Sequence, residues 1–324
     1  MFRTEIDPLP SSWKIDHSTP ILTIGSCFSD CMGKRFADNK FRVLANPFGT
    51  VYNPISIFRL LECAIDRASP FEEHFVKTQD LWAHYDFHSR FACEDRHQLE
   101  HNLRSSMEDA HQFLKTADCV IITFGTAVVY ENKQSGRIVA NCHKVPAREF
   151  TRSILNPQQI GEAFSGFLEK LSAINKSVRL ILTVSPVRHV KDTLEVNSVS
   201  KSVLRLACDT FVRQYSNMSY FPSYEVMMDD LRDYRFYTSD MIHPTEAAEE
   251  YIWSKFTAAW FDDETNALLR KWSAVRKAMD HRAFNPTSDG HQKFIRQTIQ
   301  RVLELSDKFD VTSELDHLRS QLIS

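Results

Sequence analysis

Short apolar runs alternate with helical patterns along most of the chain, and this alternation constrains the fold more than any other feature. The first run ends at a Gly-Ser-Cys triplet, after which Phe28, Met32 and Phe36 recur at helical spacing. Parallel strands need long crossover connections, and helical crossovers cover both faces of a sheet. We therefore predict a three-layer α/β/α, flavodoxin-like fold with five parallel strands. The predicted strands are residues 20–24, 41–45, 119–123, 179–184 and 219–222, and the main predicted helices are residues 55–65, 99–114, 157–174 and 201–215.

Two stretches interrupt this alternation. Residues 81–91 and 128–141 resemble short strands, and residues 133–136 in the second stretch read as a turn. We expect both to form β-pieces on the rim of the sheet. From residue 264 the pattern becomes helical and strongly charged, which predicts a main domain over residues 1–263 and a C-terminal helical extension over residues 264–324.

Composition narrows the range of partners and compartments. The apolar share of 43%, the charged share of 25% and the net charge of -3 are ordinary for a soluble globular protein, and such a charge does not attract nucleic acid or an anionic membrane. Acidic residues and a proline near the start disfavour a signal peptide, and no run reaches the roughly 18 apolar residues of a membrane-spanning helix. The seven scattered cysteines are expected to be free thiols in a reducing compartment, so we predict a cytoplasmic protein.

Small and polar residues follow each predicted strand. In an open parallel sheet, ligands bind at the carboxyl ends of the strands, beside the point where the strand order reverses. The segments expected there are residues 25–27 (GSC), 46–50 (NPFGT), 125–127 (GTA), 185–189 (SPVRH) and 239–244 (SDMIHP). A serine, several glycines and an acid-histidine pair are therefore predicted to converge on one edge.

Ser26, His243 and Asp240 are the predicted catalytic residues. Ser26 is expected to be exposed at the first turn of a helix, where its N–H and the helix dipole could stabilise an oxyanion. A serine nucleophile needs a base, and His243 suits this role because Asp240, three residues earlier, could orient its ring. Gly49 and Gly125 are candidates for backbone donors or for close approach to a substrate.

Five segments occur in order along the chain: GSCFS, NPFGTVYNP, ANCHKVP, SPVRH and YTSDMIHP. Together they resemble the GSCFA-domain family of the SGNH/GDSL hydrolase superfamily, over about residues 20–260. The resemblance implies an esterase that cleaves an oxygen ester through an acyl-enzyme on Ser26, with His243 as base and Asp240 as its orienting acid. It also implies an oxyanion hole that includes the amides of Ser26 and Gly49.

One segment departs from the superfamily pattern. Gly-x-Asn is usual after the third strand, whereas this chain has Gly125-Thr126-Ala127. The side-chain donor to the oxyanion is therefore open, with Thr126, Asn53 and Asn141 as the alternatives. The family's name motif also ends in alanine where this chain has Ser29, a small change that we expect to matter little.

Other residues near these motifs carry alternative interpretations. Cys27 is the alternative nucleophile, ranked below Ser26 because it follows the turn. Cys27, Cys31, Cys142 and His143 raise a zinc alternative, but structural zinc sites use more closely spaced pairs, so we predict no metal and no cofactor. The candidates for substrate binding are Asn53, His88, Asn141, His143, Arg188 and His189, with Lys144 and Arg188 as candidate anion ligands.

The predicted substrate is a small-molecule or carbohydrate ester. Water as the acyl acceptor makes an esterase, whereas a sugar hydroxyl makes an O-acyltransferase with the same triad. An alternative of another class is a non-catalytic carbohydrate- or nucleotide-binding module, which the pairing of Asp240 with His243 disfavours. The charged C-terminal helices could pack on a second copy of the chain as a homo-oligomer, and the oligomeric state is left open.

Overall fold

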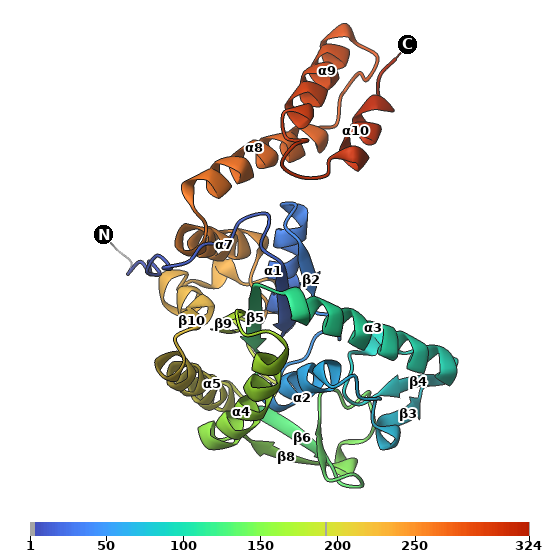
Figure 1. Cartoon of the computed structure of the whole chain (residues 1–324), viewed down its shortest axis with the longest axis vertical. Coiled ribbons are helices and arrows are strands. Elements are labelled where there is room, and N and C mark those ends of the chain that lie inside the picture. Colours follow the sequence, from blue (N-terminus) through green and yellow to red (C-terminus); the bar gives the residue numbers. More distant parts are fainter. Residues whose placement is uncertain (1–3, 192, 324) are drawn as a thin grey trace.

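The computed structural model describes residues 4–191 and 193–323, and its core is a parallel sheet of five strands (Figure 1). The strand order is β2-β1-β5-β9-β10. The strands are β1 (Ile21–Gly25), β2 (Val43–Ala45), β5 (Cys119–Phe124), β9 (Arg179–Val184) and β10 (Met218–Phe221). The prediction of a three-layer α/β/α fold on a five-stranded parallel sheet is confirmed.

The strand order reverses between β1 and β5. The chain runs outward from β1 to β2, returns to the other side of β1 at β5, and then continues outward through β9 and β10. This is the 2-1-3-4-5 order of doubly wound folds, whose ligands bind where the loops after the two central strands part. The β1–α1 turn and the loop after β5 therefore lie at the expected ligand position.

Helices cover both faces of the sheet. One layer consists of α1 (Cys27–Asp38) and α7 (Glu246–Trp260), and the other consists of α2 (Pro54–Ile65), α3 (Arg96–Thr116), α4 (Pro157–Ile174) and α5 (Leu194–Gln214). Side chains alternate along a strand, so Leu22 and Ile24 pack beneath α2 to α5 while Ile21 packs beneath α1 and α7. The short helix α6 (Ser223–Glu225) follows β10.

Small antiparallel sheets decorate the rim. Strands β3 (Phe75–Thr78) and β4 (Leu81–His84) form a hairpin, and β6 (Val128–Asn132), β7 (Arg137–Val139) and β8 (Phe150–Ile154) form a second sheet in the order β7-β6-β8. Because β6 follows β5 after three residues, its sheet stands beside the carboxyl edge of the main sheet (Figure 1). The two predicted rim regions are confirmed, although only residues 81–84 of the first are strand, and β8 was not predicted.

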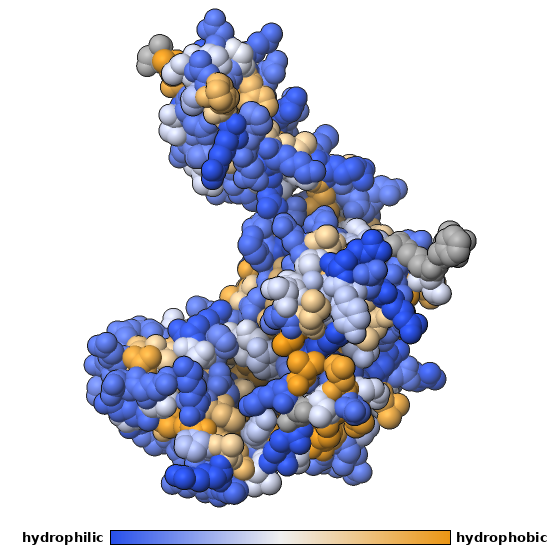
Figure 2. All heavy atoms as spheres, turned by 180° about the vertical axis from the view of Figure 1, so that it is seen from behind, coloured by the Kyte–Doolittle hydropathy of each residue, from blue (hydrophilic) through white to orange (hydrophobic). Residues whose placement is uncertain are grey.

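The C-terminal region is helical, as predicted. Helices α8 (Asp263–Met279), α9 (Asp289–Leu303) and α10 (Thr312–Arg319) share their own hydrophobic cluster. The view from behind shows a narrow neck below this lobe, whose surface is mainly hydrophilic on that side (Figure 2). The indole Nε1 of Trp272 donates to the Asp38 carbonyl at 2.7 Å, and Lys40 pairs with Glu314 at 2.7 Å, so the lobe also contacts the end of α1.

Helix α5 begins at Leu194, earlier than the predicted start at residue 201. Its first turns contain β-branched, serine and asparagine residues, which are weak helix formers. The Thr193 hydroxyl caps the helix by accepting from the Val196 N–H at 3.2 Å, and packing on the sheet supplies the rest. None of the helices in the described ranges is both long and apolar enough to span a membrane.

Gly25 gives a test of how tightly β1 approaches β5. It has a φ of +138°, and a Cβ at this position would lie 2.1 Å from the carbonyl oxygen of Thr123. Gly25→Ala should therefore lower the free energy of unfolding by about 2 kcal/mol or more, measured by urea titration. The control is Gly161→Ala on α4, where a Cβ would meet only Phe211 at 4.0 Å, so this change should stabilise the helix slightly. Equal effects of the two substitutions would contradict the close approach.

Candidate active site

The β1–α1 turn does not expose Ser26. The residue is 0% exposed, and its Oγ finds no hydrogen-bond partner among the described residues. Its N–H donates to the Thr123 carbonyl at 3.1 Å, and although Ser26 is the N-cap of α1, its side chain makes no capping bond. The expected exposure of Ser26 is therefore wrong: the strand direction continues through residue 26 and turns its side chain into the protein.

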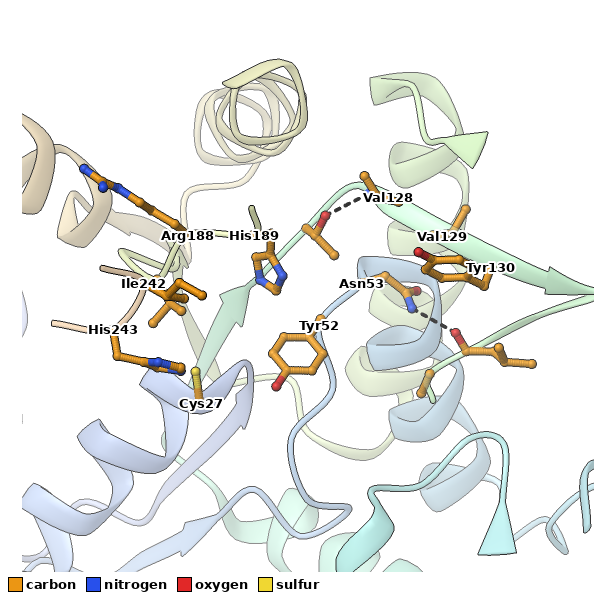
Figure 3. A pocket seen from close by; sticks show the side chains of 14 residues that line it. Cys27, Tyr52, Asn53, Val128, Val129, Tyr130, Arg188, His189, Ile242 and His243 are labelled. Carbon is orange, nitrogen blue, oxygen red and sulfur yellow. Dashed lines mark hydrogen bonds between the residues drawn. The ribbon is translucent and has the colours of Figure 1, made fainter. Parts of the chain in front are cut away.

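Cys27 is the residue of this turn that reaches the cavity. It begins α1, is half-buried, and lines a cavity of about 330 Å³ together with His243 and Tyr52. The His243 ring is directed toward the Cys27 sulfur, and the Tyr52 hydroxyl points to the same side of the cavity (Figure 3). Burial, followed by the nearby Asp30 carboxylate, raises the pKa of the Cys27 thiol to about 11, so the resting group is a neutral thiol.

Asp240 holds His243 in the loop before α7. One carboxylate oxygen accepts from Nδ1 of His243 at 2.7 Å, and the other accepts the N–H groups of Ile242 and His243 and the Thr238 hydroxyl. The hydrogen bonds from Thr238 and His243 hold the pKa of Asp240 well below its usual range. Because an ionised carboxylate only accepts, Nδ1 carries the proton and Nε2 is left to accept one from the cavity.

The expected backbone donors to the oxyanion are already bonded elsewhere. The Ser26 N–H donates within the sheet edge, and the Gly49 N–H donates to the Asn46 carbonyl at 2.8 Å. The Thr126 hydroxyl lies 3.0 Å from Ser200 Oγ and accepts the Val128 N–H at 3.0 Å. The N–H groups of Ser26 and Gly49 are therefore structural. Thr126 lines the cavity, and either hydroxyl can be the donor in its bond with Ser200. Gly49 is needed for packing, since a Cβ there would lie 2.2 Å from the Cβ of His88.

The start of α1 offers other donors. The first N–H groups of a helix have no partner within it, and the helix dipole places partial positive charge there. Although burial and Asp30 dominate, the N–H groups of Cys27 and Phe28 lower the pKa of the Cys27 thiol, which places both beside the sulfur. An oxyanion formed on an acyl group at Cys27 would lie near these groups.

The predicted substrate-binding residues divide into two groups. Asn53, Arg188 and His189 line the cavity with Cys27 and His243. The other three serve local structure instead: His88 accepts the Arg90 N–H, Asn141 accepts the His143 N–H, and the His143 ring bonds the His84 carbonyl at 2.8 Å. Of the predicted anion ligands, Lys144 bonds Gln79 and Arg188 lies over the Tyr237 ring at 3.8 Å.

The cavity walls are largely apolar. Tyr52 lies between Cys27 and His189 (Figure 3). Its ring is 5.1 Å from the His189 ring in an edge-on arrangement. Gly125 makes room for it, because a Cβ there would lie 3.0 Å from the Tyr52 ring. The remaining apolar lining comes from Val128, Val129, Tyr130, Val139, Ala140, Val187 and Ile242.

One face of α5 clamps the loops of the site, and the sequence reading missed it. Asn197 accepts the His189 N–H at 2.9 Å, and Ser200 accepts the Ala127 N–H at 2.7 Å. Lys201 donates from Nζ to the carbonyls of Gly125 and Ser185 at 2.8 and 2.7 Å. Spacings of three and four residues place these side chains on one helical face. The spacing of Asn197, Ser200 and Lys201 could have indicated this face. It was missed because the predicted helix began at residue 201, after the first two of these residues.

The zinc alternative finds no support among the described residues. The residues with ligand atoms close enough for a metal are His74, His84 and Asp86, not the cysteines considered above. Asp86 is bonded by His74 Nδ1 at 2.8 Å and paired with the Arg59 guanidinium. Since Arg59 already neutralises this buried carboxylate, the cluster is better explained as an internal ion-pair network.

Comparison with known families agrees with the motifs that shape this site. The GSCFA family matches residues 20–256, and the C-terminal domain of GSCFA domain proteins matches residues 272–324. The chain belongs to the GSCFA family. No curated protein shows significant similarity to it.

Thiol labelling tests whether Cys27 faces the cavity. In the native protein, iodoacetamide should modify Cys27 while Cys119 and Cys208, which are fully buried, stay unmodified. The rate at Cys27 should rise about tenfold from pH 8 to pH 9, because only the thiolate reacts and its pKa is high. Peptide mass spectrometry gives the rate at each cysteine. A Cys27 as inert as Cys119 would show that its side chain is not accessible.

Proposed function

We propose that this protein is an acyl-transfer enzyme of the SGNH/GDSL type that cleaves an oxygen ester through a thioester on Cys27. The observation that carries the proposal is the meeting of the Cys27 thiol and the Asp240-oriented His243 ring in one cavity, where the strand order reverses. A nucleophile, a base and an acid that orients the base are the parts that covalent acyl transfer requires.

The proposed reaction moves one acyl group and one proton at a time. Cys27 Sγ attacks the ester carbonyl while its proton passes to Nε2 of His243, and the N–H groups at the start of α1 stabilise the oxyanion. Collapse breaks the carbon–oxygen bond, and the leaving alkoxide takes the proton from His243. Water then attacks the thioester with His243 as base, which releases the acid and restores the thiol. Asp240 keeps the imidazole in the required tautomer throughout.

Cys27 replaces Ser26 as the proposed nucleophile because of where each side chain points. Ser26 Oγ is enclosed and does not line the cavity, whereas Cys27 does. A neutral resting thiol also suits a mechanism in which His243 removes the proton during attack rather than beforehand.

The apolar walls support a substrate whose acyl part is apolar. Valines on β6 and β7 and the side chain of Ile242 would surround it, while the alcohol part, a small molecule or a sugar, would leave through the open side. A sugar hydroxyl in place of water would make the same site an O-acyltransferase. No cofactor is part of the proposed chemistry. The seven free thiols support a cytoplasmic location.

Substitutions at two neighbouring positions distinguish Cys27 from Ser26 as the nucleophile. Cys27→Ala should lower turnover of short p-nitrophenyl esters by about a thousandfold or more, because it removes the attacking atom. Ser26→Ala should keep turnover within about threefold. It should leave the unfolding free energy unchanged or raised, since it deletes a buried hydroxyl that has no partner among the described residues. Initial rates and urea titrations measure both effects.

The outcomes distinguish three accounts. Lost turnover in Ser26→Ala with full turnover in Cys27→Ala would return the nucleophile to Ser26 and contradict the proposal. Wild-type protein that binds esters without cleaving them would indicate a binding module instead. Cys27→Ser is the matched control for shape, and we expect it to fold normally with turnover between those of the wild type and Cys27→Ala.

A further inference from the structure

Lys201 is a buried amine with an unusual set of partners. It lies on α5, is 1% exposed, and donates to two backbone carbonyls, those of Gly125 and Ser185. These residues directly follow β5 and β9, so the amine lies at the carboxyl edge of the sheet. In the described part of the chain no carboxylate forms an ion pair with it. A buried lysine without a counter-charge is costly to folding and is typical of functional sites.

The surroundings link this amine to Cys27. Gly125, whose carbonyl Lys201 bonds, and the next residue connect the two. Gly125 packs on Tyr52, and Thr126 lines the same cavity as Cys27. Burial lowers the pKa of Lys201 to about 7. The negative charge of a Cys27 thiolate has the opposite, smaller effect on this pKa. The effect is mutual, because the Lys201 charge lowers the pKa of Cys27, against the larger opposing effects of burial and Asp30.

Other titratable groups also face this pair. Around Cys27 these are Asp30 on its own helix, Tyr52 from the loop before α2, and His243 from the loop before α7. Around Lys201 the Tyr224 ring lies 5.7 Å from Nζ. The charge of Asp30 disfavours a thiolate on Cys27, whereas the charge of Lys201 favours one.

We propose that the protonated Lys201 amine stabilises the Cys27 thiolate from beneath the site and thereby helps Cys27 to release its proton to His243. Lys201 keeps its own proton in this step, and the thiol proton goes to Nε2 of His243. The carbonyl bonds fix the amine in place at the ends of β5 and β9. Lys201 is therefore a positioning residue for the nucleophile. This inference rests on the proposed role of Cys27.

Alkylation of Cys27 by iodoacetamide in wild type and Lys201→Gln gives the test. Glutamine keeps two N–H donors but has no charge. The measured quantity is the alkylation rate of wild type divided by that of Lys201→Gln. This ratio should be high at pH 6, where Lys201 carries its proton. It should fall severalfold as the pH rises through about 7, because the amine then loses its proton. Cys93, far from α5 in sequence and on the rim, is the internal control, with a ratio near one at every pH.

Lys201→Arg provides the complementary measurement, because arginine keeps its charge at all these pH values. It should match wild type at pH 6 and react faster than wild type at pH 9. Either variant decides the question alone, and thermal unfolding confirms the fold of each. A ratio that is offset but constant with pH would mean that Lys201 only supports the loops, and would overturn the proposal.

Failure of the proposed function would look different. Alkylation requires the thiol but no ester turnover. If the ratio follows the expected pH dependence while Cys27→Ala still cleaves esters, the coupling of Lys201 to the thiol stands and the proposed catalytic role of Cys27 fails. If Cys27→Ala is inactive and the ratio is constant, the nucleophile stands and the role of Lys201 fails.

Discussion

The close pairing of β1 with β5 determines what the candidate site contains. Gly25 lies opposite Thr123, and without a side chain it can approach the Thr123 carbonyl closely enough for the next N–H to bond it. This pairing fixes the direction of the chain as it leaves the strand. Ser26 then points inward and Cys27 begins the helix with its side chain toward the cavity. The choice between two adjacent candidate nucleophiles follows from this one contact.

The rest of the site is assembled from distant segments by hydrogen bonds rather than by apolar packing. Asp240 uses both carboxylate oxygens to hold its own loop and the His243 ring. Asn197, Ser200 and Lys201 tie the loops after β5 and β9 to a single helical face. Charge-assisted bonds and buried polar networks restrict movement, which is what a reaction that depends on the position of a proton requires. In the proposed reaction, the apolar residues of the rim sheet would contact the substrate.

Much of this arrangement could be predicted from the sequence. Buried strands are marked by short apolar runs, so their number and order along the chain were right, and the Asp240–His243 spacing led to a pair that the structure brings together. Which residue of the β1–α1 turn faces the cavity could not be predicted in the same way. Which of two neighbouring side chains faces a cavity depends on the backbone angles of the turn, and serine or cysteine at positions 26 and 27 suits several of them. The N–H groups of Ser26 and Gly49 are bonded elsewhere, and this could not be predicted because a sequence does not show whether an N–H is already bonded.

Lys201 illustrates the other limit of sequence reading. Its neighbours Asn197 and Ser200 precede the predicted helix, so their common face was not visible, and a lysine is ordinarily expected at the surface. Only tertiary packing places its amine beneath the strand ends.

The most direct test of the central claim is to locate the acyl group during turnover. The protein would be mixed with a chromogenic ester, quenched in acid while hydrolysis is in progress, digested and mapped by tandem mass spectrometry. The account predicts one acyl group on the Cys27 sulfur, lost in Cys27→Ala and retained in Ser26→Ala. An acyl group on the Ser26 oxygen, or turnover with no acylated residue, would contradict it.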